Sequence, residues 1–343
     1  MAMLSFGMNL QANPPVSRVV EWSKLSEDSG FDYLWLWDSH VLWQEVVSIF
    51  ALIAANTSRI KIGPCVTNPV TRDPTVTASA LATLNEVSSG RMVMGIGRGD
   101  SARRVIGKKP VSVERLEWAC RLIRDLSAGR EVDFEGTKLQ LKWSLGHEVE
   151  IWVAAYGPMA LRAAGRVADG LIMQLADPYI IEWSLPFVRE GAEEAGRRFE
   201  DIQVMSAAPA HVGEDLAYAR DQVRWFPALV SNHVVDLVNR YKTAELPQEL
   251  TDYIRARDHY DYAEHGRVGA EHASFVTDEV VDRFCVLGTA EECIRKLKEL
   301  EALGVTQFND YNMGEDPAEQ IRIFGQQIIP AFRQPAMSEE VPT

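Results

Sequence analysis

Polar side chains follow several short apolar runs of this sequence, where they could do chemistry. Asp38-Ser39-His40 comes directly after the apolar run at residues 33–37. An imidazole at such a position can donate a hydrogen bond or move a proton near neutral pH. His40 is therefore a candidate general acid or base, and a histidine that only caps a loop is the alternative.

A glycine-rich segment, Gly95-Ile96-Gly97-Arg98-Gly99-Asp100, ends another apolar run. It differs from the G-x-G-x-x-G fingerprint of a dinucleotide site, because Asp100 stands where the third glycine belongs. Its glycines would still allow a ligand to approach the backbone closely. We expect either a cofactor-binding turn that includes Gly97, Arg98 and Asp100, or a tight turn with no ligand.

Tyr156-Gly157-Pro158-Met159 joins an apolar run to a helical pattern. Proline suits the first turn of a helix, because the N–H that it lacks would be unpaired there. The remaining free N–H groups and the positive end of the helix dipole favour an anion. The junction is a candidate phosphate site, although every strand-to-helix junction of a barrel has such a helix start.

Other chemistries lack their residue patterns. The cysteines Cys65, Cys120, Cys285 and Cys293 form no CxxC pair, so we expect reduced, buried thiols. The sequence contains neither G-x-S-x-G nor H-E-x-x-H, which gives a hydrolase no support. The spacing of His259, His265 and His272 does not predict a zinc site, and we expect no metal.

Strand-like runs alternate with amphipathic stretches along the chain. We predict strands at residues 4–10, 33–37, 60–67, 91–97, 150–155, 170–175, 201–212 and 305–311. Helices are predicted at residues 16–29, 46–56, 74–88, 113–128, 158–168, 179–197, 290–303 and 317–332, with another opening at Asp215. This α/β alternation indicates a parallel sheet, and eight strands favour a closed (β/α)8 TIM barrel.

The expected domain organisation is a single barrel at residues 1–332 with a flexible tail at residues 333–343. Two insertions interrupt the pattern. One is a predicted β-hairpin near residues 131–142, and the other is a charged, aromatic segment at residues 231–277. The second insertion is predicted to be a lid over a polar substrate, with a solvated irregular loop as the alternative.

In a (β/α)8 barrel the reactive groups lie at the carboxyl ends of the strands. That rule selects these residues: Asn9, Gln11, Asp38, His40, Thr67, Asn68, Arg98, Asp100, Tyr156, Gly157, Gln174, Asn309 and Asp310.

Charge and hydropathy exclude two classes of partner. The 49 acidic residues outnumber the 35 Lys and Arg residues, which gives a net charge of −14. Such a surface repels phosphate backbones, so we expect no nucleic-acid partner. No apolar run reaches about 18 residues, and the N-terminus lacks the features of a signal peptide. We therefore expect a cytoplasmic protein that acts on a small molecule.

Four stretches of the chain carry a family resemblance: GFDYLWLWDSH, IKIGPCVTNPVTRDPTVTASALATLNEVSSGRMVMGIGRGDSA, EIWVAAYGPMALRAAGRVADGLIM and LGTAEECIRKLKELEALGVTQFNDY. Together they resemble the luciferase-like monooxygenase superfamily of flavin- and F420-dependent oxidoreductases. Within it, they are most similar to the branch of methylenetetrahydromethanopterin reductase. The resemblance implies a (β/α)8 barrel with a flavin-type cofactor at its mouth.

The resemblance also implies roles for individual residues. Asp38 and His40 match the family's acidic and histidine pair beside the reactive ring, although Ser39 separates them here. Cys65-Val66 matches a bulge where related enzymes carry a non-proline cis peptide. The other matched positions are Thr67 and Asn68, beside the pyrimidine side of the ring, and Gly157, Pro158 and Met159, at the cofactor phosphate.

Two cofactors are compatible with this resemblance. Our first expectation is FMN, reduced by a separate flavin reductase, with O2 oxygenating a small organic substrate. The alternative is coenzyme F420, which transfers hydride without O2 and whose polyglutamate tail would favour a basic groove. The net charge of −14 disfavours such a groove, but a local patch could form from Arg98, Arg103, Arg104, Lys108 and Lys109.

A non-catalytic flavin-binding barrel is the rival from another functional class, because a fold does not imply an activity. For either class, the resemblance implies a homodimer or homotetramer.

Overall fold

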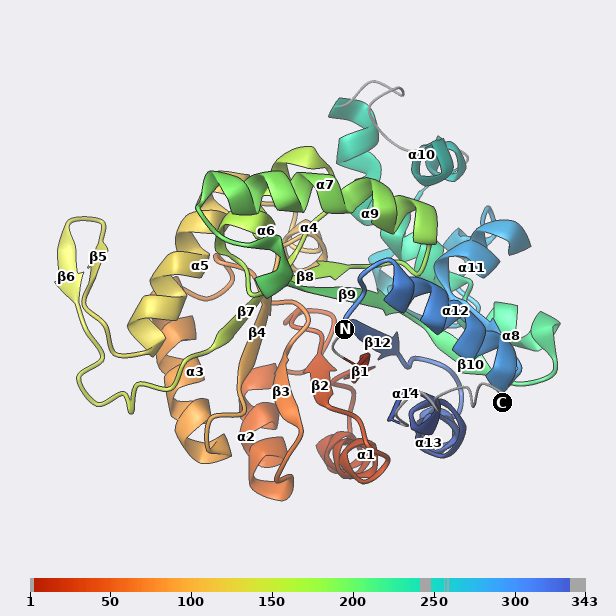
Figure 1. The fold of residues 1–343 in the computed structure, drawn as a ribbon, viewed down its shortest axis with the longest axis horizontal. Coiled ribbons are helices and arrows are strands. Elements are labelled where there is room, and N and C mark those ends of the chain that lie inside the picture. The colour runs from red at the N-terminus through yellow and green to blue at the C-terminus, as the bar shows by residue number, and fades with distance from the viewer. Residues whose placement is uncertain (1–2, 241–247, 256, 258, 334–343) are drawn as a thin grey trace, which may run out of the picture.

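The computed structural model describes residues 3–240, 248–255, 257 and 259–333, and it contains the predicted barrel (Figure 1). Its eight parallel strands lie in the order β3-β2-β1-β12-β9-β8-β7-β4. They are β1 (Ser5–Leu10), β2 (Tyr33–Leu36), β3 (Lys61–Pro64), β4 (Val93–Ile96), β7 (Glu150–Ala154), β8 (Gly170–Met173), β9 (Gln203–Ala208) and β12 (Gln307–Tyr311). Because β1 pairs with β12, the first and last of these strands lie side by side.

The two ends of this order, β3 and β4, meet at a seam that closes the barrel. The amide of Ile62 donates to the carbonyl of Arg91 at 2.9 Å. At the other end of the seam, the amide of Thr67 donates to the Gly95 carbonyl and the amide of Gly97 donates to the Thr67 carbonyl, both at 2.9 Å. The seam is thus hydrogen-bonded at both of its ends.

Two glycines allow the backbones to come this close at the seam. A Cβ atom on Gly63 would lie 2.2 Å from the carbonyl oxygen of Val93. A Cβ atom on Gly95 would lie 2.4 Å from the carbonyl oxygen of Pro64. Backbone atoms cannot move away as the end of a flexible side chain can, so both positions require glycine.

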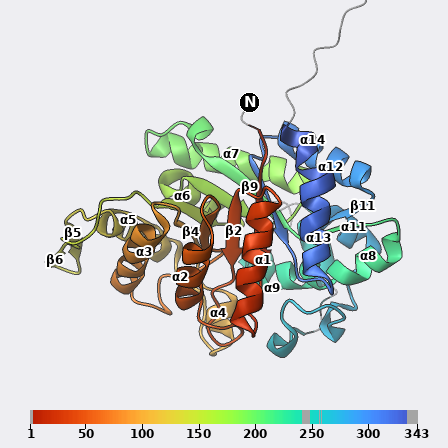
Figure 2. The same cartoon turned by 90° about the horizontal axis from the view of Figure 1, so that it is seen from below.

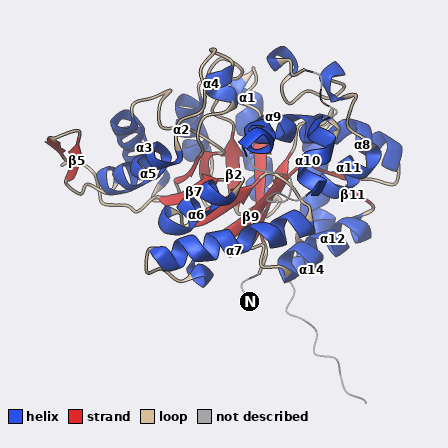
Figure 3. Ribbon diagram, turned by 90° about the horizontal axis from the view of Figure 1, so that it is seen from above, coloured by secondary structure: helices blue, strands red, loops and turns tan. Residues whose placement is uncertain are grey.

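Helices surround the strands on the outside of the barrel (Figures 2 and 3). They are α1 (Val16–Asp28), α2 (Val46–Asn56), α3 (Pro74–Ser88), α5 (Val113–Ser127), α6 (Pro158–Val167), α7 (Pro178–Glu194), α12 (Ala290–Ala302) and α13 (Pro317–Ile323). Local capping fixes several starts: the Asp73 carboxylate accepts from the amide of Thr75 at 2.8 Å, and Thr289 and Glu292 form a capping box.

Aromatic rings fill the barrel interior below its mouth. Trp35 stacks on Tyr33 with ring centroids 5.7 Å apart, and it packs edge-on against Trp152 at 6.0 Å. The indole N–H of Trp35 donates to Gln307 Oε1 at 3.2 Å. This packing confines a ligand to the carboxyl ends of the strands.

The predicted strand at residues 201–212 is two strands in the structure. After β9, Pro209 interrupts the ladder and β10 (Ala210–Val212) leaves the barrel to pair with β11 (Val286–Gly288), a strand that the sequence did not predict. The Asp310 carboxylate holds this exit, because its Oδ1 accepts from the amide of Ala210 at 2.8 Å. Asp310, predicted at the mouth, is therefore buried against this exit, and burial raises its pKa to about 7.

The C-terminal pattern at residues 317–332 is likewise not one α-helix. It consists of α13, a π-helical turn (Phe324–Ile328) and α14 (Pro330–Arg333). Pro330 has no N–H to continue the regular hydrogen bonds, which accounts for the break. Of the predicted tail at 333–343, residues 334–343 lie outside the described part of the chain.

The hairpin near residues 131–142 is confirmed as β5 (Val132–Phe134) and β6 (Thr137–Leu139), which project from one side of the barrel (Figure 1). The segment at residues 231–277 is more regular than predicted. The helix α9 (Trp225–Arg240) runs across its start, and α10 (Gln248–Arg255) and 3-10 turns at Tyr262–Glu264 and Glu271–Ala273 follow. The remaining helices are α4 (Ser101–Arg104), α8 (Leu216–Val223) and α11 (Asp278–Phe284), and a 3-10 turn spans Phe199–Asp201.

Within the described ranges, no helix combines the length and apolar character that crossing a membrane requires.

The seam makes a testable prediction about stability. Gly95→Ala should lower the free energy of unfolding by about 3 kcal/mol, because the new methyl group overlaps a backbone oxygen. The matched control is Gly213→Ala, whose Cβ would meet no atom closer than 3.7 Å. Urea denaturation of both variants measures the difference, and equal stabilities would contradict this account of the seam.

Candidate functional site

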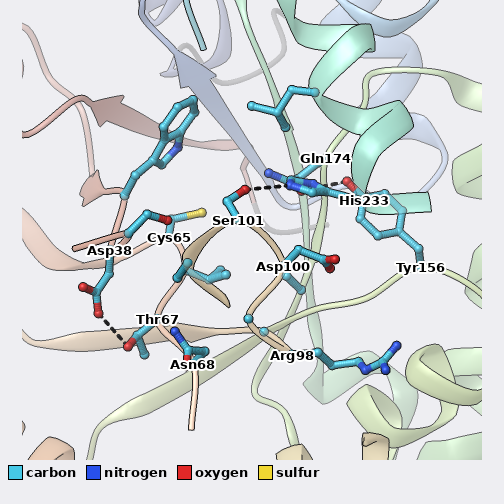
Figure 4. A pocket seen from close by; sticks show the side chains of 18 of the residues that line it. Asp38, Cys65, Thr67, Asn68, Arg98, Asp100, Ser101, Tyr156, Gln174 and His233 are labelled. Carbon is cyan, nitrogen blue, oxygen red and sulfur yellow. Dashed lines mark hydrogen bonds between the residues drawn. The ribbon is translucent and has the colours of Figure 1, made fainter. Parts of the chain in front are cut away.

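A cavity opens at the carboxyl ends of the strands, and we call it the mouth cavity (Figure 4). Strands β2, β3, β4, β7 and β8 lead into it, and α9 and the segment after α10 cover it. Its lining residues are Trp37, Asp38, Ser39, Cys65, Val66, Thr67, Asn68, Gly97, Arg98, Gly99, Asp100, Ser101, Ala102, Ala154, Tyr156, Ala160, Gln174, Leu229, His233 and His265.

Most of the predicted site residues meet in this cavity. Those that line it are Asp38, Cys65, Val66, Thr67, Asn68, Gly97, Arg98, Asp100, Tyr156 and Gln174. The predicted cis peptide between Cys65 and Val66 is confirmed. Gly157, Pro158 and Met159 are not among the lining residues, but they form the N-terminus of α6, whose residue Ala160 does line the cavity.

Asp38 is buried and serves as an anchor for the loop after β3. Its Oδ2 accepts from the Thr67 hydroxyl at 2.7 Å, and its Oδ1 accepts from Arg72 Nη2 at 3.0 Å. Arg72 Nη1 also donates to Oδ2. Both carboxylate oxygens are therefore engaged, which suits a positioning role, and the catalytic role expected for Asp38 stays a prediction.

His40 does not lie where the sequence analysis expected it. Its side chain is exposed and is not among the residues that line the mouth cavity. The cause is a local turn, in which the amides of Leu42 and Trp43 both donate to the Ser39 carbonyl, at 2.8 and 2.9 Å. This turn carries His40 to the surface, so its acid–base role stays a prediction that this geometry does not support.

Two other histidines occupy the cavity instead. His233 comes from α9 and His265 from the segment that follows α10. Both lie in the segment predicted as a lid, at residues 231–277. His265 was named there only for its spacing to other histidines, and His233 was not named because it follows no predicted strand.

The segment that carries His265 is docked onto the first two strands of the barrel. Gln11, just after β1, donates from Nε2 to the carbonyl of Gly266 at 2.9 Å. The His265 ring packs against the indole of Trp37, just after β2, with centroids 5.9 Å apart. These contacts hold an imidazole from the insertion at the mouth of the barrel.

A hydrogen-bonded group of side chains comes from the carboxyl ends of β7, β8 and β12. The Tyr156 hydroxyl donates to Gln174 Oε1 at 2.7 Å, and Gln174 Nε2 donates to the Tyr311 hydroxyl at 3.0 Å. The Tyr311 oxygen lies 3.6 Å from Cys65 Sγ. Burial raises the pKa of Cys65 to about 12, so this thiol stays protonated and does not serve as a nucleophile near neutral pH.

A second cavity, which we call the basic cavity, lies beside the first. Its lining residues are Arg104, Gly107, Lys108, Lys109, Asn232, Ile254, Arg257, Tyr260 and Tyr262. None of these lining residues is acidic, although the chain as a whole carries a net charge of −14. Burial, with a smaller contribution from the charge of Arg104, lowers the pKa of Arg257, as expected where cations gather.

The two cavities share a wall. Asn232 lines the basic cavity and the next residue, His233, lines the mouth cavity. On α4, Arg104 Nε donates to Asp100 Oδ1 at 2.9 Å, and these two residues line different cavities. A ligand in the mouth cavity could therefore extend an anionic arm into the basic cavity. This is the local basic patch that the sequence analysis considered, although Arg98 and Arg103 are not among the residues lining the basic cavity.

Comparison with known proteins gives relatives that span the chain. The model of the luciferase-like monooxygenase family matches residues 2–307. The chain is 30% identical to 5,10-methylenetetrahydromethanopterin reductase from Methanolobus tindarius, over 95% of this chain and 100% of the relative. It is 26% identical to F420-dependent glucose-6-phosphate dehydrogenase from Microbacterium testaceum, over 92% of this chain and 94% of the relative.

A solved structure resembles the whole fold. It is the coenzyme F420-dependent tetrahydromethanopterin reductase from Methanopyrus kandleri, with a TM-score of 0.76 and 25% sequence identity. The alignment covers 97% of this chain and 100% of that structure.

The burial of His265 makes stability depend on pH. Burial, with smaller contributions from His233 and His272, lowers the pKa of His265 from 6.5 to about 3. Between these values the unfolded chain binds a proton that the folded chain does not, so stability is lost as the pH falls below 6.5. From pH 7 to pH 5, the free energy of unfolding should fall by about 2 kcal/mol more for the wild type than for His265→Gln. Equal losses in urea denaturation would show that His265 is not a buried neutral group.

Proposed function

The chain belongs to the luciferase-like monooxygenase family, and we propose that the cofactor of its redox chemistry is coenzyme F420. As its relatives indicate, the protein is an oxidoreductase. Bound F420 supplies or accepts a hydride at its ring. We infer that the substrate is a small organic molecule with a carbonyl, imine or alcohol group.

The basic cavity is the observation that carries this proposal. F420 ends in a polyglutamate tail, and the mouth cavity adjoins a cavity whose described lining residues include four cations and no acidic residue. Two relatives named above also carry F420 in their names. An anionic tail would offset the mutual repulsion of Lys108, Lys109 and Arg257.

The mouth cavity itself fits a flat ring. Val66, Gly97 and Ala154 present small side chains or none, and a Cβ atom on Gly97 would already lie 3.1 Å from Val66 Cγ2. Thr67, Asn68, Gln174 and Ser101 place hydroxyl and amide groups around this slot. These residues would hold the ring, and α9 with the His265 segment would limit the access of water.

Reduced FMN with O2 is the second candidate, and the description of the matched family favours it. FMN would use the same slot, and a flavin reductase would be its partner. FMN has no tail, however, so this candidate gives the basic cavity no ligand. A homodimer or homotetramer stays a proposal that rests on family resemblance.

Titration of the apoprotein with each cofactor distinguishes the two candidates. We expect F420 to bind with a Kd at least tenfold lower than that of FMN, which corresponds to about 1.4 kcal/mol. Lys108→Glu should raise the Kd of F420 about tenfold at low ionic strength, and added salt should reduce the effect. The matched control, Lys138→Glu on the distant hairpin, should leave the Kd unchanged. Tighter binding of FMN, or equal effects of both substitutions, would overturn the assignment of F420.

The N-terminus of α6 makes a separate prediction about the cofactor phosphate. Gly157 has φ 73°, so any side chain there would strain the backbone, and the exposed neighbour Met159 is the better position for the test. Met159→Glu should raise the Kd of F420 about tenfold, because a carboxylate at the helix start repels the phosphate. Met159→Gln has a similar shape and no charge, and it should change the Kd less than twofold. Similar Kd values for Glu and Gln would place the phosphate elsewhere.

A further inference from the structure

A continuous chain of hydrogen bonds runs from the basic cavity to the mouth cavity. The Tyr260 hydroxyl lies 2.5 Å from His265 Nδ1, and His265 Nε2 lies 3.2 Å from the Ser101 hydroxyl. The same hydroxyl lies 3.3 Å from His233 Nε2, and His233 Nδ1 lies 2.8 Å from Gln174 Oε1. Figure 4 shows the last two of these hydrogen bonds.

The chemistry of the last member gives the chain a direction. Gln174 Oε1 is a carbonyl oxygen and can only accept, so His233 must carry its proton on Nδ1. His233 Nε2 is then an acceptor, and the Ser101 hydroxyl must donate to it. One hydroxyl has one proton, so Ser101 must accept from the other imidazole.

The same reasoning fixes the other half of the chain. His265 must carry its proton on Nε2 to donate to Ser101, which leaves Nδ1 as an acceptor. The Tyr260 hydroxyl then donates to Nδ1. As neutral imidazoles, the two histidines therefore have opposite tautomers, and every donor in the chain points from Tyr260 towards Gln174.

The surroundings favour the neutral imidazoles that this arrangement needs. Burial lowers the pKa of both His233 and His265. The negative charge of Asp100 raises the pKa of His233, whereas the positive charges of Arg104 and Arg257 lower it further. The neighbouring histidines His233 and His272 also lower the pKa of His265.

The two ends of the chain lie in different cavities. Tyr260 lines the basic cavity, whereas Ser101, His233 and Gln174 line the mouth cavity. The Gln174 amide cannot pass a proton onward, so a proton that enters at Tyr260 arrives at His233. We propose that Tyr260, His265, Ser101 and His233 form a proton relay that supplies the mouth cavity from the basic cavity.

In the relay step, four protons each move by one place. A hydronium ion in the basic cavity gives a proton to the Tyr260 oxygen and is left as water, and the proton of Tyr260 moves to His265 Nδ1. The proton on His265 Nε2 moves to the Ser101 oxygen, and the Ser101 hydroxyl proton moves to His233 Nε2. One positive charge crosses, no electrons move, and His233 can then protonate the product of hydride addition. Only the protonation of this product by His233 rests on the proposed function.

The tautomers can be tested on the apoprotein by ¹⁵N NMR of labelled imidazoles. At pH 7 we expect the Nδ1–H tautomer for His233 and the Nε2–H tautomer for His265. Ser101→Ala should release the tautomer of His265, whereas Gln174 should still hold His233 in its Nδ1–H form. Ser101→Thr, which keeps the hydroxyl, should preserve both tautomers. The reverse tautomers, or a charged imidazole at either position, would overturn the relay. None of these outcomes depends on which cofactor binds.

Proton transfer is tested by the exchange of the His265 Nε2 proton with D2O, with F420 filling the mouth cavity. Tyr260→Phe should slow this exchange at least tenfold, because it removes the entry point. Tyr218→Phe removes a surface hydroxyl that donates to Glu315, from a residue that lines neither cavity, and should leave the rate unchanged. Equal rates in wild type and Tyr260→Phe would overturn the relay. If F420 does not bind, its titration of the apoprotein shows that the proposed function has failed. The ¹⁵N NMR measurement of the tautomers still tests the relay in that case.

Discussion

The seam between β3 and β4 is the contact on which the rest of the site depends. Two backbones approach so closely there that Gly63 and Gly95 cannot carry a side chain. The seam brings the segment after β3, with Cys65, Val66, Thr67 and Asn68, against the segment after β4, from Gly97 to Ser101. These two segments form one wall of the mouth cavity. A wider seam would separate the groups that hold a ring from Ser101, the residue that joins the two histidines of the proton relay.

The insertion after α9 completes what the barrel begins. Strand ends supply the floor and one wall of the mouth cavity, but both of its imidazoles come from α9 and the segment after α10. The docking of Gly266 on Gln11 and of His265 on Trp37 ties this segment to β1 and β2. The same segment supplies Tyr260 and Tyr262 to the basic cavity. One insertion thus shapes two neighbouring cavities with different charge, which suits a ligand with a flat ring and an anionic arm.

Sequence patterns predicted the regular part of this molecule well, because buried parallel strands and capped helices leave local signals. The eight barrel strands and starts such as Pro74 follow directly from apolar runs and capping residues. Exceptions arose where a distant residue overrides local preference, as at Pro209, where Asp310 binds the amide of Ala210. The site followed the same rule. Most cavity residues that directly follow a strand could be predicted. His40 was predicted in the mouth cavity, but a four-residue turn carries it to the surface. His233 could not be predicted, because only tertiary packing brings it to the mouth cavity.

The central claim is that one ligand occupies both cavities, with its ring in the mouth cavity and its anionic tail in the basic cavity. A crystal structure of the protein grown with coenzyme F420 tests this claim most directly. We expect the ring beside Val66 and Gly97, within reach of His233, and the tail along Lys108, Lys109 and Arg257. A ring bound outside the mouth cavity, or a tail directed away from these cations, would contradict it.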